Sequence, residues 1–545
     1  MTRTRLLVAL LAAAALPYLV GLGDSSIWDA NEAFYVETPR EMIEAGDFIN
    51  PSFNYLPRFN KPVLSYWVVA AFYHLFGVSV AVERIPIALS AFVLMAAAFG
   101  IGRALKSSEA GLWSAIALAT SPRVLMFARR IFIDMWVTMF LGLTLLAFVL
   151  AERYPERRDR YLLLMYVAAG LGTLTKGPVA IVLPALVFGV YLAVQRRLGD
   201  LRRMRLLTGA IVVLAIVAPW YGALYVQHGW EHIVGFFWGE NVARYADAVA
   251  PSRGVLFYPP VVFGDMFPWS LLLVAAAVRC LAPIVRNRGQ LAPGTDLRLL
   301  LWAWILVIVG FFTLSATKQD LYIFPIVVAV AALAGDLLGD GDRGTRLTRW
   351  MLALAGVLLI VAAAFVRRMF GGGGHVYQVD GVLPIVVAAG IAGAAAATLA
   401  VRRRLFAAAF TIAGCLALLN WIFVLWTLPS FERYKPVPPL SEAIRARAAE
   451  DAAVVHYNVA LPSMVFYLRR HVDQVFDDPE ALINKLGDAR EFYLVLRTTE
   501  YEALRGEMPV PVCVVDRRPF FDVKLNTLLA REELPEVVLI TNRCP

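Results

Sequence analysis

Long apolar runs separated by short polar segments dominate the first 430 residues. The runs are about 18–20 residues long, the length at which a helix crosses the ~30 Å hydrocarbon core of a bilayer. Because a lipid-exposed backbone must satisfy its own hydrogen bonds, we predict that the runs are helices. Thirteen runs qualify as transmembrane helices: 5–22, 84–102, 110–127, 134–151, 161–175, 177–194, 206–226, 260–278, 298–315, 320–338, 350–366, 382–400 and 405–427.

One further apolar stretch, Val63 to Val82, is ambiguous, and the positions of the basic residues decide whether it crosses. If it does not cross, nearly every basic cluster lies on the same side as Arg3 and Arg5. If it crossed, every later cluster would move to the outer side, against the positive-inside rule. We therefore predict a juxtamembrane or re-entrant segment, a cytoplasmic N-terminus and a first outer loop at residues 23–83.

The pattern changes after about residue 430, where short β-rich runs such as "AAVVHYNV" and "EFYLVLR" alternate with helical stretches. This alternation is typical of an α/β domain. The predicted fold class is mainly α: a polytopic membrane domain at residues 1–429 with about 13 transmembrane helices, then a small extracytoplasmic α/β domain at residues 430–545. Cys513 and Cys544 would both face an oxidising compartment there, so we expect a disulfide between them.

Composition agrees with a membrane protein. The chain is 59% hydrophobic and 17% charged, against ~45–50% and ~25% in soluble proteins. The net charge of +9 is explained by basic cytoplasmic loops, so we expect no nucleic-acid partner. The basic start and the run from Leu6 to Leu22 predict a spanning helix, with a cleavable signal peptide as the alternative.

Ionisable residues gather at the outer ends of the spans, where they are candidates for function. Lys61, Lys176 and Lys318 each end an apolar segment on the outer side, where the positive-inside bias predicts no lysine. Together with the acids of the first loop, they suggest a phosphate site beside an acid/base site. The alternative is that such side chains are membrane-edge anchors, and we favour that interpretation for Arg58.

These residue types suit a reaction on a lipid-linked phosphate. Cations stabilise a leaving phosphate as its charge develops. A carboxylate can deprotonate the acceptor or stabilise a cationic sugar ring. The sequence therefore indicates displacement at a carbon that bears a phosphate leaving group.

Ordered motifs in the first 325 residues resemble a known family. The stretch "WDANEAFYVETPREMIEAGDFINPSFNYLPRFNKPVLSYW" (28–67) resembles the first outer loop of GT-C class membrane glycosyltransferases. The most similar group comprises the lipid A aminoarabinose transferases and their protein O-mannosyltransferase relatives. "ARRIFIDM" (128–135), "LTKGPVAIVLP" (174–184), "PWYGALYVQHG" (219–229) and "FTLSATKQDLYIFP" (312–325) match in the same order.

The resemblance implies an inverting enzyme that moves one sugar, a hexose or a pentose, from a polyprenyl (undecaprenyl) phosphate to an acceptor such as lipid A or another glycolipid. It implies a reaction at the periplasmic face of the bacterial inner membrane. It also implies roles for residues, which fall into three groups. The catalytic candidates are Asp29, Glu32 and Asp134; the donor-phosphate candidates are Lys61, Lys176, Lys318, Tyr322 and Arg129; the substrate-binding candidates are Asn31, Tyr35, Arg58, Glu240 and Arg244.

The sequence departs from the family at the position of its aspartate. The family's Asp-Glu pair is Asn31-Glu32 here, and an amide cannot act as a base. Asp29 is one candidate to replace it. The other possibility is that no strong base is needed, because a phosphate acceptor arrives already ionised.

Two rival functions remain open from the sequence. One is a protein O-mannosyltransferase-like enzyme that acts on Ser or Thr hydroxyls. The other is a transporter or flippase of lipid-linked sugars, which would be expected to carry charges near mid-span; the span centres here are almost free of charge. We expect no metal or other cofactor, with a divalent metal as the alternative, and a monomer in the bilayer.

Overall fold

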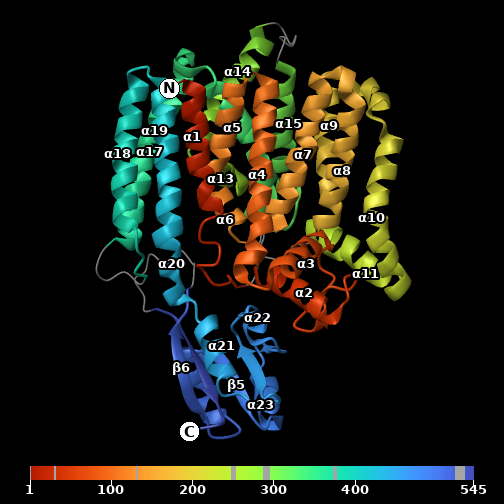
Figure 1. Ribbon diagram of the computed structural model, residues 1–545, viewed down its shortest axis with the longest axis vertical. Helices are drawn as coiled ribbons and strands as arrows, with labels where there is room; N and C mark the ends of the chain where they lie inside the picture. Colours follow the sequence, from red (N-terminus) through yellow and green to blue (C-terminus); the bar gives the residue numbers. More distant parts are fainter. Residues whose placement is uncertain are drawn as a thin grey trace.

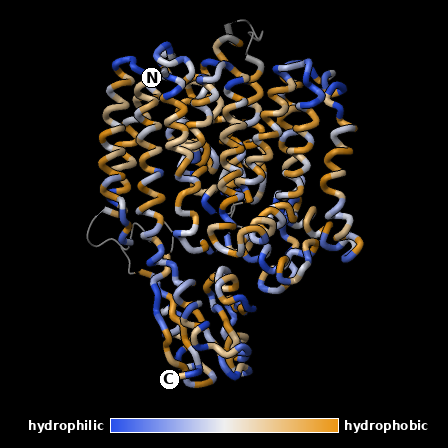
Figure 2. Tube along the Cα trace, viewed as in Figure 1, coloured by the Kyte–Doolittle hydropathy of each residue, from blue (hydrophilic) through white to orange (hydrophobic). Residues whose placement is uncertain are grey.

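The computed structural model describes residues 2–29, 32–130, 133–246, 253–286, 295–371, 377–521 and 534–544. A bundle of long helices forms one end of the molecule, and a small sheet domain forms the other end (Figure 1). The N-terminus lies at the end of the bundle far from the sheet domain. Hydrophobic residues cover most of the bundle and hydrophilic residues gather at its two ends (Figure 2), the pattern of a protein that spans a bilayer.

Within the described residues, eight helical segments are long and apolar enough to cross a membrane. They are α4 (Val80–Leu105), α7 (Ile133–Arg153), α10 (Leu206–His228), α15 (Thr295–Leu314), η6 with α16 (Asp320–Leu338), α17 (Arg346–Phe370), α18 (Val382–Val401) and the segment Leu405–Tyr434, which begins with α19 (Leu405–Ile422).

Two bent helix pairs raise the number of candidate spans to ten. The first pair is α5 (Ser108–Ala119) with α6 (Pro122–Ala128), bent by 66°, and the second joins α13 (Tyr258–Asp265) to α14 (Leu272–Arg286), bent by 118°. Three more helices stand in the bundle beside them (Figure 1): α1 (Arg3–Ala15), α8 (Arg158–Lys176) and α9 (Val179–Val194). The first and last are short, with 13 and 16 residues, and α8 carries charged residues in its first turn and at its end.

The first loop folds across the end of the bundle that faces the sheet domain. It contains α2 (Glu32–Ala45), the short strands β1 (Ser52–Phe53) and β2 (Leu56–Pro57), and α3 (Leu64–Phe76). Figure 1 shows α2 and α3 between the bundle and the sheet domain. The 13 residues of α3 reach about 20 Å at ~1.5 Å per residue, less than the ~30 Å of the bilayer core. A helix of this length agrees with the prediction that Val63 to Val82 does not cross.

A buried arginine at the start of α4 fastens this loop to the bundle. Arg84 is 1% exposed. Its guanidinium donates to both carboxylate oxygens of Glu32, at 2.7 and 2.9 Å, and to the carbonyls of Leu22 and Ser25, at 2.7 Å each. A charge this deep is tolerated only when it is paired and hydrogen-bonded. These contacts thus hold the segment from Leu22 to Ser25 and the start of α2 against the first residues of α4.

The C-terminal part of the chain forms a five-stranded sheet in the order β4-β3-β5-β7-β6. The strands are β3 (Ala453–Tyr457), β4 (Asp473–Val475), β5 (Phe492–Arg497), β6 (Cys513–Pro519) and β7 (Glu536–Thr541). β3 runs parallel to β4 and β5, and β7 runs antiparallel to β5 and β6. A disulfide joins Cys513 on β6 to Cys544, just after β7.

Alternation along the strands gives this sheet two apolar faces. Val454, Val495 and Leu539 contribute to one buried cluster, and their neighbours Val455 and Leu494 to the other. Successive side chains of a strand point to opposite faces, so both faces must be covered. The helices α21 (Val437–Arg445), α22 (Met464–Leu468), α23 (Pro479–Asp488) and α24 (Thr498–Leu504) contribute residues to these clusters.

The sheet domain is docked on the first loop by polar and apolar contacts. The side-chain amide of Asn54 donates to the carbonyl of Val472 and its oxygen accepts from the Val472 N–H, both at 2.8 Å. Phe53 is buried in the same cluster as residues of α21 and α22. The first loop is therefore packed between the bundle and the domain.

We predict that Arg84→Met destabilises the protein by about 3–5 kcal/mol, because the substitution leaves the buried carboxylate of Glu32 without its partner. Thermal unfolding of the detergent-solubilised protein, followed by tryptophan fluorescence, measures the effect. Arg402→Met removes an exposed arginine at the end of α18 and serves as the control. An unfolding temperature of Arg84→Met equal to that of the control would contradict this account.

Candidate active site

A cavity of about 650 Å³ lies where the first loop meets the ends of several membrane helices. Its walls come from α2 and the segment 58–61, from the start of α7, the α8–α9 junction, the segment 236–246, and the end of α15 with η6 (Asp320–Ile326). The charged side chains in the wall are four cations and two carboxylates: Arg58, Lys61, Lys176, Arg244, Asp134 and Glu240. The sign of the cavity is therefore positive.

One ion pair is placed by two neighbouring antiparallel helices. Asp134 lies in the first turn of α7 and Lys176 is the last residue of α8, and the two form an ion pair. The partial positive charge at a helix N-terminus favours the carboxylate there, and the partial negative charge at a C-terminus favours the ammonium. The Lys176 ammonium also lies 5.8 Å from the centre of the Tyr322 ring, within reach of a cation–π contact.

A second ion pair joins the first loop to a π-helix, η4 (Gly235–Ala243). Lys61 lies 2.9 Å from the Glu240 carboxylate, and Arg244 approaches the same group at 3.5 Å. Burial lowers the pKa of Lys61 below its ordinary value, while the charge of Glu240 opposes that shift. π-Helical segments are frequent at functional sites, and here the segment brings Glu240 and Arg244 together.

Arg58 is the cavity cation that has no carboxylate partner within the described residues. Its guanidinium lies 4.1 Å above the centre of the Phe34 ring and donates to the Tyr66 hydroxyl at 3.2 Å. Tyr35 stacks on Tyr66 with the ring centres 5.7 Å apart. These aromatic contacts hold Arg58 at the cavity wall, where its charge stays available to an anion. Arg58 is therefore a candidate ligand for an anion in the cavity, and not only the membrane-edge anchor that we favoured from the sequence.

The wall of the cavity also has an extensive apolar part, formed by side chains of the membrane helices. Val137 and Leu141 come from α7, Val182 and Leu183 from α9, and Phe312 from α15. An amphiphile fits such a wall, since its charged group can lie among the cations while its chain follows the apolar side chains.

The structure brings eight of the candidate residues to this cavity. They are Asp134, Lys61, Lys176, Tyr322, Tyr35, Arg58, Glu240 and Arg244. Asn31 lies outside the described residues.

Two predicted phosphate ligands do not line the cavity and contact backbone carbonyls elsewhere. The Lys318 ammonium donates to the carbonyl of Ser315 at 2.7 Å. Arg129 donates to the carbonyls of Pro17 and Val20 at 2.6 Å and to that of Gly21 at 2.7 Å. Arg129 thus ties down the chain that follows α1, and in the described part of the chain neither cation forms an ion pair with a carboxylate of the cavity.

Two predicted catalytic acids also lie away from the cavity wall. Asp29 accepts a hydrogen bond from the Ser463 N–H at 2.8 Å, and burial raises its pKa to about 6. Glu32 pairs with Arg84 and accepts from the Trp28 N–H at 2.8 Å. Both carboxylates therefore hold parts of the fold together, and the geometry gives no support to their prediction as catalytic groups.

Several polar wall residues were missed from the sequence. Ser315 and Gln319 flank Lys318 in the segment "SATKQDLY", and Asn60 and Asn241 adjoin Lys61 and Glu240. An uncharged polar residue at the membrane edge does not by itself indicate a functional site. The positions of these residues beside the predicted charged residues could have identified them as candidates.

Three comparisons with known proteins agree on the kind of protein this is. The family model described as "Dolichyl-phosphate-mannose-protein mannosyltransferase" matches residues 60–222. An undecaprenyl phosphate-alpha-4-amino-4-deoxy-L-arabinose arabinosyl transferase of Pseudomonas fluorescens is 30% identical over 66% of this chain and 61% of its own. The enzyme of the same name from Pseudomonas aeruginosa is 32% identical over 62% of this chain and 60% of its own. The chain thus matches about three fifths of the length of these relatives.

A solved structure extends the likeness to the whole fold. ArnT from Cupriavidus metallidurans bound to undecaprenyl phosphate superposes with a TM-score of 0.79 over 99% of this chain and 98% of its own, at 23% identity. The resemblance predicted from the sequence motifs is confirmed. The protein is a multi-pass membrane protein with the fold of ArnT, and its sequence is similar to the aminoarabinose transferases and, over residues 60–222, to the protein mannosyltransferase family model.

Proposed function

We propose that the protein is an inverting glycosyltransferase that moves one sugar from an undecaprenyl phosphate donor to a glycolipid acceptor such as lipid A. The observation that carries the proposal is the cavity, in which four cations and two carboxylates adjoin an apolar wall at the end of the membrane helices. The names of the relatives, which specify undecaprenyl phosphate and aminoarabinose, support the choice of donor.

The cations account for the leaving group. The donor phosphate is a diester with a single negative charge, and breaking the bond between the sugar carbon and the phosphate oxygen adds a second charge. Lys61, Lys176 and Arg58 surround a place where that charge can develop, and preorganised donors of this kind lower the barrier of such steps. The polyprenyl chain would follow the apolar wall of α7 and α9.

The carboxylates account for the acceptor side. Asp134 is our choice for the group that receives a proton from a hydroxyl acceptor or stabilises the cationic sugar ring. A phosphate acceptor arrives ionised and then needs only the second of these roles. Asp29 takes no part, because it does not line the cavity.

The orientation that we propose for the protein in the membrane rests on the basic residues of its loops. We propose thirteen spans, formed by the ten candidates together with α1, α8 and α9. The basic loops and the N-terminus would lie in the cytoplasm of a bacterial cell, and the sheet domain and the cavity would lie in the periplasm. The disulfide between Cys513 and Cys544 supports an oxidising compartment for the sheet domain. A single chain contains all the parts of the proposed site, so we propose that a monomer is active.

Asp134→Asn should lower the rate of sugar transfer by about 10²–10⁴-fold, the usual cost of losing a positioned acid/base group, if the acceptor is a hydroxyl. Asp29→Asn should leave the rate close to that of the wild type, because an amide oxygen still accepts the hydrogen bond from Ser463. Transfer is measured in detergent with undecaprenyl-phosphate sugars and a panel of glycolipid and Ser/Thr peptide acceptors. An inactive Asp29→Asn beside an active Asp134→Asn would assign the base to Asp29 instead.

Lys61→Met should weaken binding of undecaprenyl phosphate by about 10–100-fold, the factor expected for a lost hydrogen bond to a charged group. Because burial lowers the pKa of Lys61, the neutral form of this lysine appears at a lower pH than usual, and wild-type affinity should fall as the pH rises into that range. Lys61→Arg should retain affinity there. Fluorescence titration from pH 7 to 10 measures both effects, with Lys485→Met on the sheet domain as the control.

Equal affinity of Lys61→Met and Lys485→Met for undecaprenyl phosphate would place the donor phosphate elsewhere. The same titration also tests Arg58→Met, whose loss of affinity should not depend on pH because an arginine stays charged throughout.

Reporter fusions test the orientation. A fusion after Arg404 should report the cytoplasm and a fusion after Arg433 the periplasm, because Leu405–Tyr434 crosses the membrane between them. A cytoplasmic signal after Arg433 would contradict the proposed topology.

A further inference from the structure

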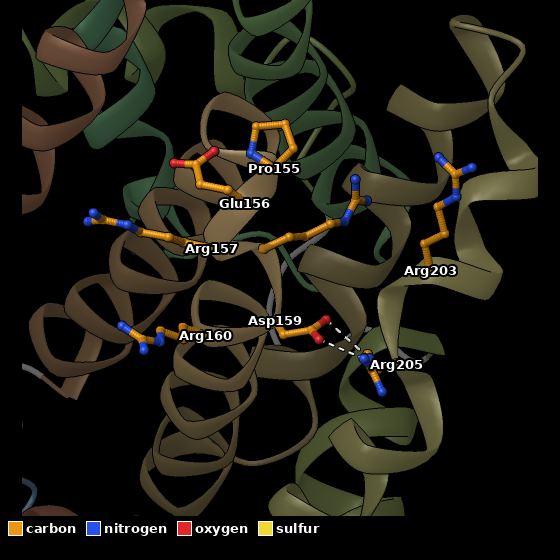
Figure 3. A pocket seen from close by; sticks show the side chains of 8 residues that line it. Pro155, Glu156, Arg157, Asp159, Arg160, Arg203 and Arg205 are labelled. Carbon is orange, nitrogen blue, oxygen red and sulfur yellow. Dashed lines mark hydrogen bonds and ion pairs between the residues drawn. The ribbon is translucent and has the colours of Figure 1, made fainter.

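A second cavity, of about 630 Å³, lies between two loops, one joining α7 to α8 and the other α9 to α10. Figure 3 shows its side chains. One wall comes from η2 (Pro155–Arg157) and the first turn of α8, and the other from η3 (Leu198–Met204) and Arg205. Both loops lie at the end of the bundle far from the sheet domain, because Lys176, at the other end of α8, lines the first cavity.

Arginines dominate this second cavity. Five arginines face two carboxylates among its lining residues: Arg157, Arg158, Arg160, Arg203, Arg205, Glu156 and Asp159. Asp159 is already occupied by Arg205, whose guanidinium nitrogens lie 2.6 and 3.1 Å from its oxygens (Figure 3). Arg157 and Arg160 have no ion pair with any residue that the structure describes. The lining therefore has three more arginines than carboxylates, although Arg158 and Arg203 approach Glu152 and Asp200, which lie outside the lining, at 3.4 and 3.5 Å.

An exposed apolar stripe continues from this cavity toward the middle of the membrane. On α10, Leu207, Ile211 and Leu214 are spaced by four and three residues, which places them on one helix face. They are 77%, 60% and 61% exposed. On α8, which packs against α10, Leu163 and Leu164 are also exposed. Both helices begin at the cavity, so positive charge and apolar surface are adjacent.

We propose that this second cavity binds the phosphate headgroup of an anionic phospholipid from the adjacent leaflet, with the acyl chains on the stripe of α8 and α10. Basic loops alone are expected on the cytoplasmic side of any membrane protein. An open groove lined by arginines, two of which have no ion pair with a described residue, lies beside an apolar stripe and is more specific, because it matches both the charged and the apolar part of one lipid. Arginine binds phosphate oxygens in a bidentate manner, which suits a headgroup. The site does not depend on the proposed reaction.

The test is lipid binding to the full-length protein in detergent, with Arg157→Gln/Arg160→Gln as the cavity variant. The control is Arg402→Gln/Arg404→Gln, which removes two exposed arginines at the end of α18, outside the cavity. Both variants should unfold at the wild-type temperature without lipid, since the four side chains are exposed and form no ion pair with the residues that the structure describes. Phosphatidylglycerol, cardiolipin, phosphatidylcholine and inorganic phosphate are added separately, and bound lipid is counted by native mass spectrometry.

We expect phosphatidylglycerol and cardiolipin to bind wild type and control with equal affinity, and the cavity variant at least about 10-fold more weakly, as for lost charge-assisted hydrogen bonds. Phosphatidylcholine should not bind selectively. Two results would overturn the proposal. Equal affinity of the cavity variant and the control would mean a general lipid annulus. Inorganic phosphate that raises the unfolding temperature of wild type but not of the cavity variant, while phosphatidylglycerol and cardiolipin have no effect on either, would mean a free-anion site.

Discussion

The arrangement of the site depends on one buried ion pair, between Arg84 on α4 and Glu32 on α2. Two opposite charges taken out of water are costly to bury and become favourable only with close geometry and additional hydrogen bonds. Arg84 has both, since it also donates to the carbonyls of Leu22 and Ser25. The pair thereby sets where α2 begins, and α2 carries Phe34 and Tyr35 to the cavity wall. The apolar side chains of α2 and α3, such as Met42 and Tyr73, then pack into the core of the bundle.

The sheet domain is connected to the cavity through a series of aromatic contacts. Phe53 is part of the buried cluster of the domain and meets Phe34 with ring centres 4.6 Å apart. Phe34 in turn supports the guanidinium of Arg58 at 4.1 Å. Trp28 joins the bundle to the chain that leads into the sheet domain. The Arg130 guanidinium lies 3.7 Å and the Lys435 ammonium 4.0 Å from the centre of its ring. The domain therefore contributes to the position of a cavity cation without lining the cavity itself.

Sequence reasoning found the cations of the cavity for a reason that is physical. A lysine at the outer end of a span opposes the positive-inside bias, so Lys61 and Lys176 were visible as exceptions, and Asp134 and Glu240 followed from the motifs. The same signal could not tell that Lys176 lines the cavity and Lys318 does not, because the position of a residue in the sequence does not give the direction of its side chain. Lys318 turns back to the carbonyl of Ser315, while the adjacent Gln319 faces the cavity. Asp29 and Arg129 likewise contact segments that are distant in the chain or in another domain, and only tertiary packing reveals such partners.

The number of spans shows where composition is a good guide and where it is not. Long helices such as α4 and α7 were evident from hydropathy. The bent pairs and the short helices α1 and α9 are harder to identify from hydropathy as membrane spans. Contacts with neighbouring helices of the bundle, and not a long apolar run, hold them in place. In α8 the charged residues lie at the two ends, Asp159 and Arg160 at one and Lys176 at the other, so the polar residues that weaken its hydropathy are those that line the two cavities.

The charge balance of the first cavity has a consequence for the proposed reaction. In the structure each lysine neutralises one carboxylate, Lys176 with Asp134 and Lys61 with Glu240. A donor phosphate that enters must compete for these ammonium groups, and every contact it gains weakens the hold of a lysine on its carboxylate. Asp134 is then released from Lys176, and its oxygens become free to accept a hydrogen bond from an acceptor hydroxyl. Binding of the donor would thus prepare the carboxylate for the acceptor, so that it is available only when a sugar is present to transfer.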